Sequence, residues 1–218
     1  MIRWCFSTLM TLPLMGCIST GVRDFEVTPP TTLDTQVGSD LVLLLPSGNI
    51  VVESSRDDQL HASVRFFCSA DSDTCRKKAQ EAGIVHTQQG TTSTLSFKPS
   101  SAYTTRHADL RFRIQVPAVD QLSIEMDAGS LSVDMNSGCL DVKAGAGDVT
   151  ISVPVNTVKK VMLDANIGDA NLSIPDGEVF DERKLLVGSE VLWDQGAGSC
   201  NLKAKLQAGE VSVTLTQP

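Results

Sequence analysis

Apolar and polar residues alternate along most of the chain, which is the pattern of half-buried β-strands. The alternation is clear at 41–45 and 50–52, and the intervening 46–49 turn predicts a hairpin-like start. Further strands are expected near 64–66, 84–87, 94–98 and 110–116. A single helical stretch is expected near 72–82. The first part of the folded chain, 38–117, is therefore predicted to be rich in β-strands with one short helix.

After Pro117, a glycine followed by an x-apolar-x-apolar pattern recurs. The glycines that open these units are Gly129, Gly138, Gly147, Gly168, Gly198 and Gly209. Glycine supplies backbone angles that other residues avoid, and strict alternation places the two apolar side chains on one face. The main series, Gly129, Gly147, Gly168, Gly188 and Gly209, recurs every 18 to 21 residues, and Gly138 and Gly198 fall roughly midway between its members. This spacing predicts coils of two strands each, a flattened parallel β-solenoid over 118–218.

The predicted solenoid should end in an unpaired strand edge at its C-terminal coil. If the coils stack in sequence order, the last one finishes at Thr216 and leaves an exposed strand edge. A plain antiparallel sandwich is the alternative architecture for the same alternation.

The alternating first part, the strand ending in Val116-Pro117-Ala118 and the glycine repeats resemble the putative-adhesin family of bacterial envelope domains, relatives of auto-transporter adhesin heads. The resemblance covers about 38–216 and implies one continuous all-β domain, with a right-handed parallel β-solenoid or β-roll in its C-terminal half. It implies no catalytic or ligand-binding residues. Only the turn glycines carry over from it.

The N-terminus has the features of an export signal. A cationic start at Arg3 precedes an apolar run of about 12 residues, too short to span a membrane. The run ends in Leu14-Met15-Gly16-Cys17, which resembles a bacterial lipobox. The resemblance implies removal of 1–16, acylation of Cys17 and a lipid anchor in the membrane; an ordinary secretory signal is the alternative. The residue after the cysteine, Ile18, resembles the signal that sorts lipoproteins to the outer membrane. The sequence is compatible with display of the domain on either the periplasmic or the outer face of that membrane.

Residues 17–37 are polar and interrupted by proline, so they are expected to form a tether with at most one short strand at 22–27.

Charge narrows the range of partners. The chain has 18 Lys+Arg against 26 Asp+Glu, a net charge of −8, which argues against nucleic acid because that partner needs a basic face. The aromatic residues include only one Tyr and two Trp, so the chain has few side chains on which nucleic-acid bases could stack.

The six cysteines separate into groups. Cys5 leaves with the signal, and Cys17 takes lipid. Cys68 and Cys75 are close enough in sequence for a local disulfide in an oxidising compartment. Cys139 and Cys200 fall three coils apart, about 14 Å by strand spacing, which is too far for a bridge. Either they stay free, which is the expectation, or the assumed coil register is wrong.

Catalytic patterns are weak. His61, His86 and His107 are scattered without metal-ligand spacing, and no Gly-x-Ser-x-Gly motif is present. We therefore expect no enzyme activity, no cofactor and no metal site.

Acidic residues gather near the predicted coil turns: Asp127, Asp134, Asp141, Asp148, Asp164 and Asp169. They predict either a solvated acidic face or aligned calcium ligands. The sequence thus favours a non-catalytic envelope lipoprotein that contacts an unknown envelope protein or polysaccharide. A polysaccharide- or calcium-binding module that uses the acidic C-terminal face is the alternative.

Overall fold

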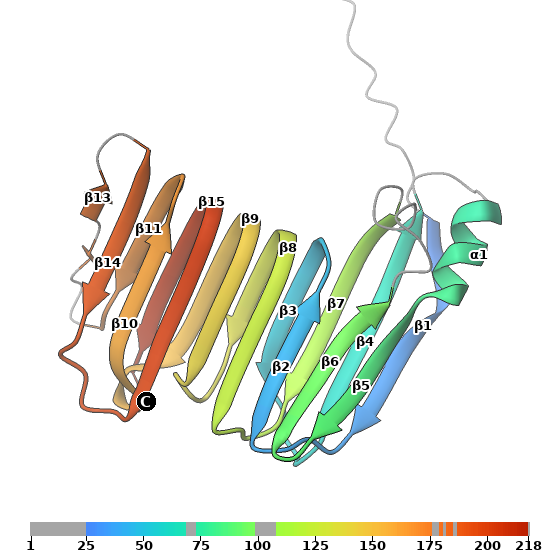
Figure 1. Cartoon of the computed structure of the whole chain (residues 1–218), viewed down its shortest axis with the longest axis horizontal. Coiled ribbons are helices and arrows are strands. Elements are labelled where there is room, and N and C mark those ends of the chain that lie inside the picture. Colours follow the sequence, from blue (N-terminus) through green and yellow to red (C-terminus); the bar gives the residue numbers. More distant parts are fainter. Residues whose placement is uncertain are drawn as a thin grey trace, which may run out of the picture.

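The computed structural model describes residues 25–68, 73–98, 108–175, 179–180, 182–184 and 187–217. These residues form a predominantly β structure in which strands stand side by side in two layers, with one short α-helix at one end (Figure 1). No helix in these ranges is long and apolar enough to cross a lipid bilayer.

The first layer contains nine strand segments. Their order in space is β5 (Gly83–Gln89), β6 (Thr92–Lys98), β2 (Asp40–Leu45), β8 (Gln121–Asp134), β9 (Leu140–Pro154), β15 (Cys200–Thr216), β10 (Val158–Ala165), β14 (Gly188–Trp193) and β13 (Glu182–Lys184). From β6 to β10 every neighbour is parallel. The strands beyond them pair antiparallel.

The second layer begins with β1 (Phe25–Thr35), β4 (Leu60–Cys68), β7 (Ala108–Val116) and β3 (Gly48–Ser54). It continues with the second halves of β8, β9 and β15, followed by β11 (Gly168–Ser173) and β12 (Val179–Phe180). From β7 to β11 the neighbours are parallel. A 3-10 turn, Val155–Thr157, connects β9 to β10.

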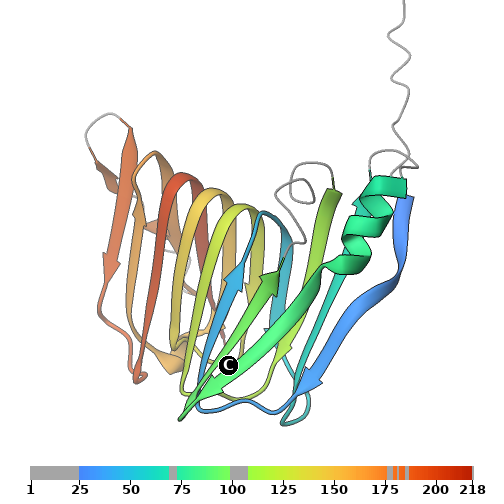
Figure 2. The same ribbon diagram turned by 45° about the vertical axis from the view of Figure 1, so that its right-hand side comes forward.

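Three long strands belong to both layers because each bends at a glycine with positive φ. Gly129, Gly147 and Gly209 have φ of 121°, 120° and 128°, and Figure 2 shows the yellow to red strands arching from one layer to the other. Gly168, with φ of 118°, makes the same bend between β10 and β11. The bends stack closely: a Cβ on Gly147 would collide with the carbonyl oxygen of Gly129. Only glycine satisfies both requirements.

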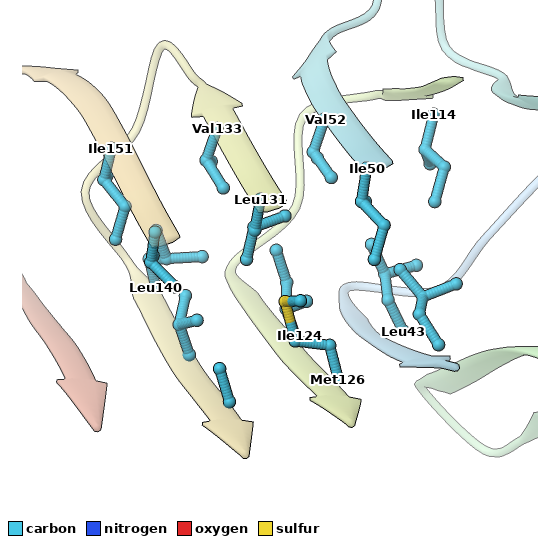
Figure 3. Close-up of a cluster of buried hydrophobic side chains, with 14 of the residues drawn as sticks. Leu43, Ile50, Val52, Ile114, Ile124, Met126, Leu131, Val133, Leu140 and Ile151 are labelled. Atoms are coloured by element: carbon cyan, nitrogen blue, oxygen red, sulfur yellow. The ribbon is translucent and has the colours of Figure 1, made fainter. Parts of the chain in front are cut away.

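Apolar side chains from both layers meet in the space between them. Leu43, Ile124 and Leu140 of the first layer face Ile50 and Leu131 of the second (Figure 3), and none of them is more than 2% exposed. The alternation in the sequence therefore reflects one inward and one outward face on each strand. The core extends continuously along the stack of strands.

The order of the strands does not follow the order of the chain. β15, the last strand, lies between β9 and β10 in the first layer and between β9 and β11 in the second. β2 and β3, which are early in the chain, lie between β6 and β7 on one side and β8 on the other. The prediction that the last repeat ends at an exposed edge is wrong, since Thr216 pairs with Pro154.

Two other expectations are corrected. β2 and β3 do not form a hairpin, because they pair with other strands and lie in different layers. The tether predicted for 17–37, with a strand at most at 22–27, is shorter than expected. Phe25–Thr35 forms β1, which pairs antiparallel with β4. Its apolar Val27 is buried and anchors the strand in spite of the prolines that follow.

Two disulfides connect elements of the described chain. Cys68 and Cys75, with Cα atoms 6.2 Å apart, link β4 to helix α1 (Asp73–Glu81), which lies within the range expected for a helix. Cys139 and Cys200 form the second bridge, with a Cα–Cα distance of 4.5 Å. The expectation of free thiols there is wrong because it placed the coils in sequence order, whereas β15 lies beside β9.

Candidate functional site

The outward face of the second layer presents side chains in regular rows. We call the outward side chains of β4, β7, β3, β8, β9, β15 and β11 the ladder face. Because the strands are paired in register, equivalent positions align in rows across them, with about 4.8 Å between neighbours. The first row is Arg65, Arg111, Asn49, Ser130, Asp148, Glu210 and Asp169. The second row is Ser63, Arg113, Val51, Ser132, Thr150, Ser212 and Asn171.

One end of the ladder face is rich in arginine. Arg65 and Arg111 are directly opposite each other on β4 and β7. Their guanidinium carbons lie 5.5 Å and 4.0 Å from the centroid of the Phe67 ring, so both cations contact the same aromatic side chain. The groove between these strands and β3 has a volume of about 440 Å³.

Each arginine is also paired with a carboxylate. Arg65 donates to Glu26 through Nε and Nη2, both at 2.6 Å. These hydrogen bonds hold the pKa of Glu26 below its ordinary value and raise the pKa of Arg65. Arg113 donates to Glu53 at 3.0 and 3.2 Å. Burial alone would raise the pKa of Glu53, but hydrogen bonds from Gln115 and Arg113 outweigh it and the pKa is lowered.

The other end of the first row is acidic. Asp148, Glu210 and Asp169 occupy adjacent strands at one register position, and each follows a glycine of positive φ. Glu210 accepts hydrogen bonds from Asn171 at 3.3 Å and from Ser212 at 2.9 Å. Like charges on neighbouring strands repel one another. In the described part of the chain no group of three or more His, Cys, Asp or Glu side chains is arranged to hold a metal ion.

A histidine bridge lies beside the arginine end. His61 Nδ1 is 2.7 Å from Asp34 on β1, and its Nε2 is 3.0 Å from both carboxylate oxygens of Asp57. Both ring nitrogens face acceptors, so both donate when the ring is an imidazolium. The hydrogen bond to Asp34, followed by that to Asp57, raises the pKa of His61.

The other histidines take no part in this bridge. His86 is on β5, where its Nε2 is buried without a hydrogen-bond partner. His107 lies outside the described residues.

The outward face of the first layer carries an open groove of about 980 Å³. It lies beside the exposed Leu44, and Lys143, which is part of its lining, donates to Glu125 at 2.9 Å. This hydrogen bond raises the pKa of Lys143. The groove is shallow and surrounded by side chains of mixed charge, so it offers a surface for contact more than an enclosed site.

The predicted turn glycines have two structural roles. Gly129, Gly147, Gly168 and Gly209 make the positive-φ bends. Gly138 and Gly198 instead permit close packing: a Cβ on Gly138 would collide with the Val158 side chain, and one on Gly198 would collide with the backbone of Thr157.

The other predicted residues lie in different parts of the chain and of the fold. Leu14, Met15, Gly16 and Cys17 lie outside the described residues. Among the acids near turns, Asp148 and Asp169 are in the first row of the ladder face. Asp141 and Asp164 lie on strands of the first layer, Asp134 ends β8, and Asp127 is beside the bend of that strand.

Sequence reasoning missed Glu210 and the three arginines of the ladder face. A signal for Glu210 was present, because it follows Gly209 as Asp148 follows Gly147. The arginines alternate with buried residues on β4 and β7, but their alignment depends on the pairing of strands that are more than 40 residues apart.

Comparison with known proteins finds no matching family model and no matching curated protein. Solved structures similar to this chain include a putative cell adhesion protein from Clostridium sporogenes ATCC 15579, with 11% identity, coverage of 86% of this chain and 100% of that chain, and a TM-score of 0.49. A putative adhesin from Bacteroides fragilis NCTC 9343 has 12% identity, coverage of 85% and 97%, and a TM-score of 0.28. A putative lipid binding protein from Parabacteroides distasonis ATCC 8503 has 10% identity, coverage of 87% and 98%, and a TM-score of 0.23. Two of these three neighbours are thus described as putative adhesion proteins and one as a putative lipid binding protein, all at low sequence identity.

Proposed function

We propose that this protein is a non-catalytic, lipid-anchored interaction module of the bacterial cell envelope, and that the ladder face is its contact surface. The observation that carries the proposal is the ladder face itself, which presents seven in-register strands with polar side chains in regular rows. Such a surface suits a broad macromolecular partner more than a small molecule, which is usually held in an enclosed apolar pocket.

The proposed architecture is a right-handed parallel β-solenoid with its last coil inserted among earlier ones. The parallel register between β8, β9 and β15 and their equivalent bends support this interpretation. A stack of this kind is stiff, because each unit contacts its neighbours along the whole length of its strands.

The anchor is proposed to be lipid on Cys17. β1 begins at Phe25, so the linker has eight steps and reaches about 28 Å at most when fully extended. The domain would therefore stay close to the membrane surface, which we propose is that of the outer membrane. Replacement of Cys17 by serine should abolish acyl labelling and release the protein from membranes. Labelling that persists in this variant would contradict the anchor.

The contact surface can be tested by site-specific photocrosslinking in cells. A photoreactive residue at Ser132, on the ladder face, should give a discrete crosslinked product, of a mass other than twice that of the chain, that a probe at Lys203, on the first layer, does not give. Equal crosslinking from both positions, or from neither, would contradict the choice of face. Protease treatment of intact and permeabilised cells then separates a surface partner from a periplasmic one.

A second candidate function is the binding of a polysaccharide, favoured by the hydroxyl and amide groups of Ser132, Thr150, Ser212 and Asn171 in the second row. Affinity electrophoresis in gels that contain a neutral or an acidic polysaccharide tests it. Retardation that is lost when Thr150 is replaced by lysine would support this candidate, and unchanged mobility in every gel would refute it.

A further inference from the structure

The first row of the ladder face changes the sign of its charge from one end to the other. It has seven positions, with Ser130 at the centre. Arg65 and Arg111 lie three and two strands to one side of Ser130, and Asp169 and Glu210 lie three and two strands to the other side. The row is therefore complementary in charge to its own reverse.

We propose that two copies of this chain pack ladder face to ladder face around a two-fold axis that runs between the faces, parallel to the strands, at Ser130. Such an axis reverses the order of the strands and keeps each position along them. Arg111 of one copy then faces Glu210 of the second copy, Arg65 faces Asp169, and each contact is made twice. An axis along the row would instead place arginine against arginine. The proposed dimer forms without the lipid anchor and without an envelope partner; it covers the ladder face, so the second copy and the envelope partner would occupy that face in turn.

The arginine end keeps donors for a second partner. Arg111 uses Nε to bond Asp109 at 2.9 Å, which leaves both of its Nη groups for other acceptors. The guanidinium side chains are also more exposed than the acids that they pair with. Arg65 is 52% exposed against 29% for Glu26. Although each arginine is paired with an acid, its positive end faces solvent.

The acidic end lacks compensating cations. In the described ranges, Asp148, Glu210 and Asp169 form no ion pair with Lys or Arg, and each side chain is exposed. Repulsion among three aligned carboxylates is relieved when arginines approach from outside. A second copy supplies arginines opposite Glu210 and Asp169 and the amide of Asn49 opposite Asp148.

The available area is consistent with a weak dimer. Seven strands spaced by about 4.8 Å and rows that span about five residues give roughly 500 Å² for each copy, or about 1,000 Å² in total. This total is near the lower limit for specific interfaces. The face carries polar side chains and no central aromatic anchor, so association should depend on charge and fall as salt screens it.

One residue on the axis opposes association. Asp134 is on β8, four residues beyond Ser130, and faces Asp134 of the second copy. Replacement of Asp134 by asparagine should therefore strengthen the dimer, an effect that no interface elsewhere on the molecule predicts. An unchanged or weakened association in D134N would contradict this axis.

Sedimentation velocity of the full chain carrying Cys17→Ser, over a range of concentrations and at low and high salt, tests the dimer. Arg111→Glu and Glu210→Arg should each lower the association constant about tenfold or more, since two attractions become two repulsions. The double variant R111E/E210R, and an equimolar mixture of the two single variants, should recover association. Lys205→Glu on the first layer is the control with the same change in charge.

The variants separate the possible outcomes. Circular dichroism and thermal melting establish that each one folds. A protein that stays monomeric at every concentration and salt overturns the proposal. The proposal is also overturned if K205E lowers the association constant as much as R111E does, or if the mixture of the two single variants fails to associate. A dimer that recovers in the double variant and in the mixture supports it. Because photocrosslinking to an envelope partner is read separately, a failed dimer leaves the proposed function standing.

Discussion

Replacement of Cys139 and Cys200 by alanine tests how the last strand is held inside the stack. The bridge joins the start of β15 to the residue before β9, 61 positions earlier in the sequence. Without it, β15 is retained by backbone pairing and by its buried side chains alone. We expect the variant to fold, because both flanking strands remain, but with a lower free energy of unfolding.

The magnitude follows from the loops that the two bridges close. In the chain-entropy treatment, a crosslink over a loop of about 60 residues stabilises the fold by about 4 kcal/mol, and one over about 8 residues by about 2.5 kcal/mol. The C139A/C200A variant should therefore lose about 1.5 to 2 kcal/mol more than the C68A/C75A variant. Cys68–Cys75, with a separation of seven residues, is the matched control in the same chain.

Urea denaturation is the assay, with circular dichroism for the strands and the fluorescence of Trp193 as a local probe. Trp193 is 6% exposed on β14 and pairs with Val161 of β10, the neighbour of β15. Coincident transitions by both probes would establish two-state unfolding. If the loss in C139A/C200A is no larger than in C68A/C75A, the reasoning from loop length is refuted.

Three further predictions follow from the bends, the core and the histidine bridge. Gly147→Ala should cost several times the roughly 1 kcal/mol expected for Gly90→Ala, as measured by urea midpoints, since Gly90 has positive φ but open space around it. Ile151→Ala should cost about 2–5 kcal/mol through the cavity that it leaves, and a loss under 1 kcal/mol would contradict tight packing between the layers. The pKa of His61 is raised in the folded state, so its stabilisation is complete below the unfolded pKa of about 6.5 and is lost as pH rises through the folded pKa. The wild-type advantage over His61→Gln should therefore shrink from pH 5 to pH 9, and a constant difference would argue against an imidazolium.

The sequence predicted the elements of this protein better than their arrangement. Alternation identified the strands at 41–45, 50–52, 94–98 and 110–116 because each has one buried and one solvated face. The glycine pattern located the bends because positive φ and close packing leave no room for a Cβ. Both signals are local, so they can be read without knowledge of the fold.

The order of the strands could not be read in the same way. A parallel strand is equally compatible with several neighbours of the same alternation, and the alternation between Gly198 and Thr216 does not distinguish insertion beside β9 from addition at an edge. The cysteines held the missing information. Their conflict with sequential stacking was visible at Cys139 and Cys200, and a disulfide there requires β15 to lie next to β9. The alignment of charges on the ladder face could not be predicted either, because it depends on the same order of strands.

Insertion of early and late strands has consequences for both stability and surface. Because β2, β3 and β15 have parallel neighbours on both sides, they are among the most enclosed strands of the described chain. The edge strands of the stack are β1 and β5 at one end and the short β12 and β13 at the other. Insertion of β3 also separates Arg111 from Ser130 by one strand, and insertion of β15 places Glu210 between two aspartates. The balanced spacing of charge about Ser130 is thus a product of the non-sequential strand order, which links the topology of this protein directly to the surface that it presents.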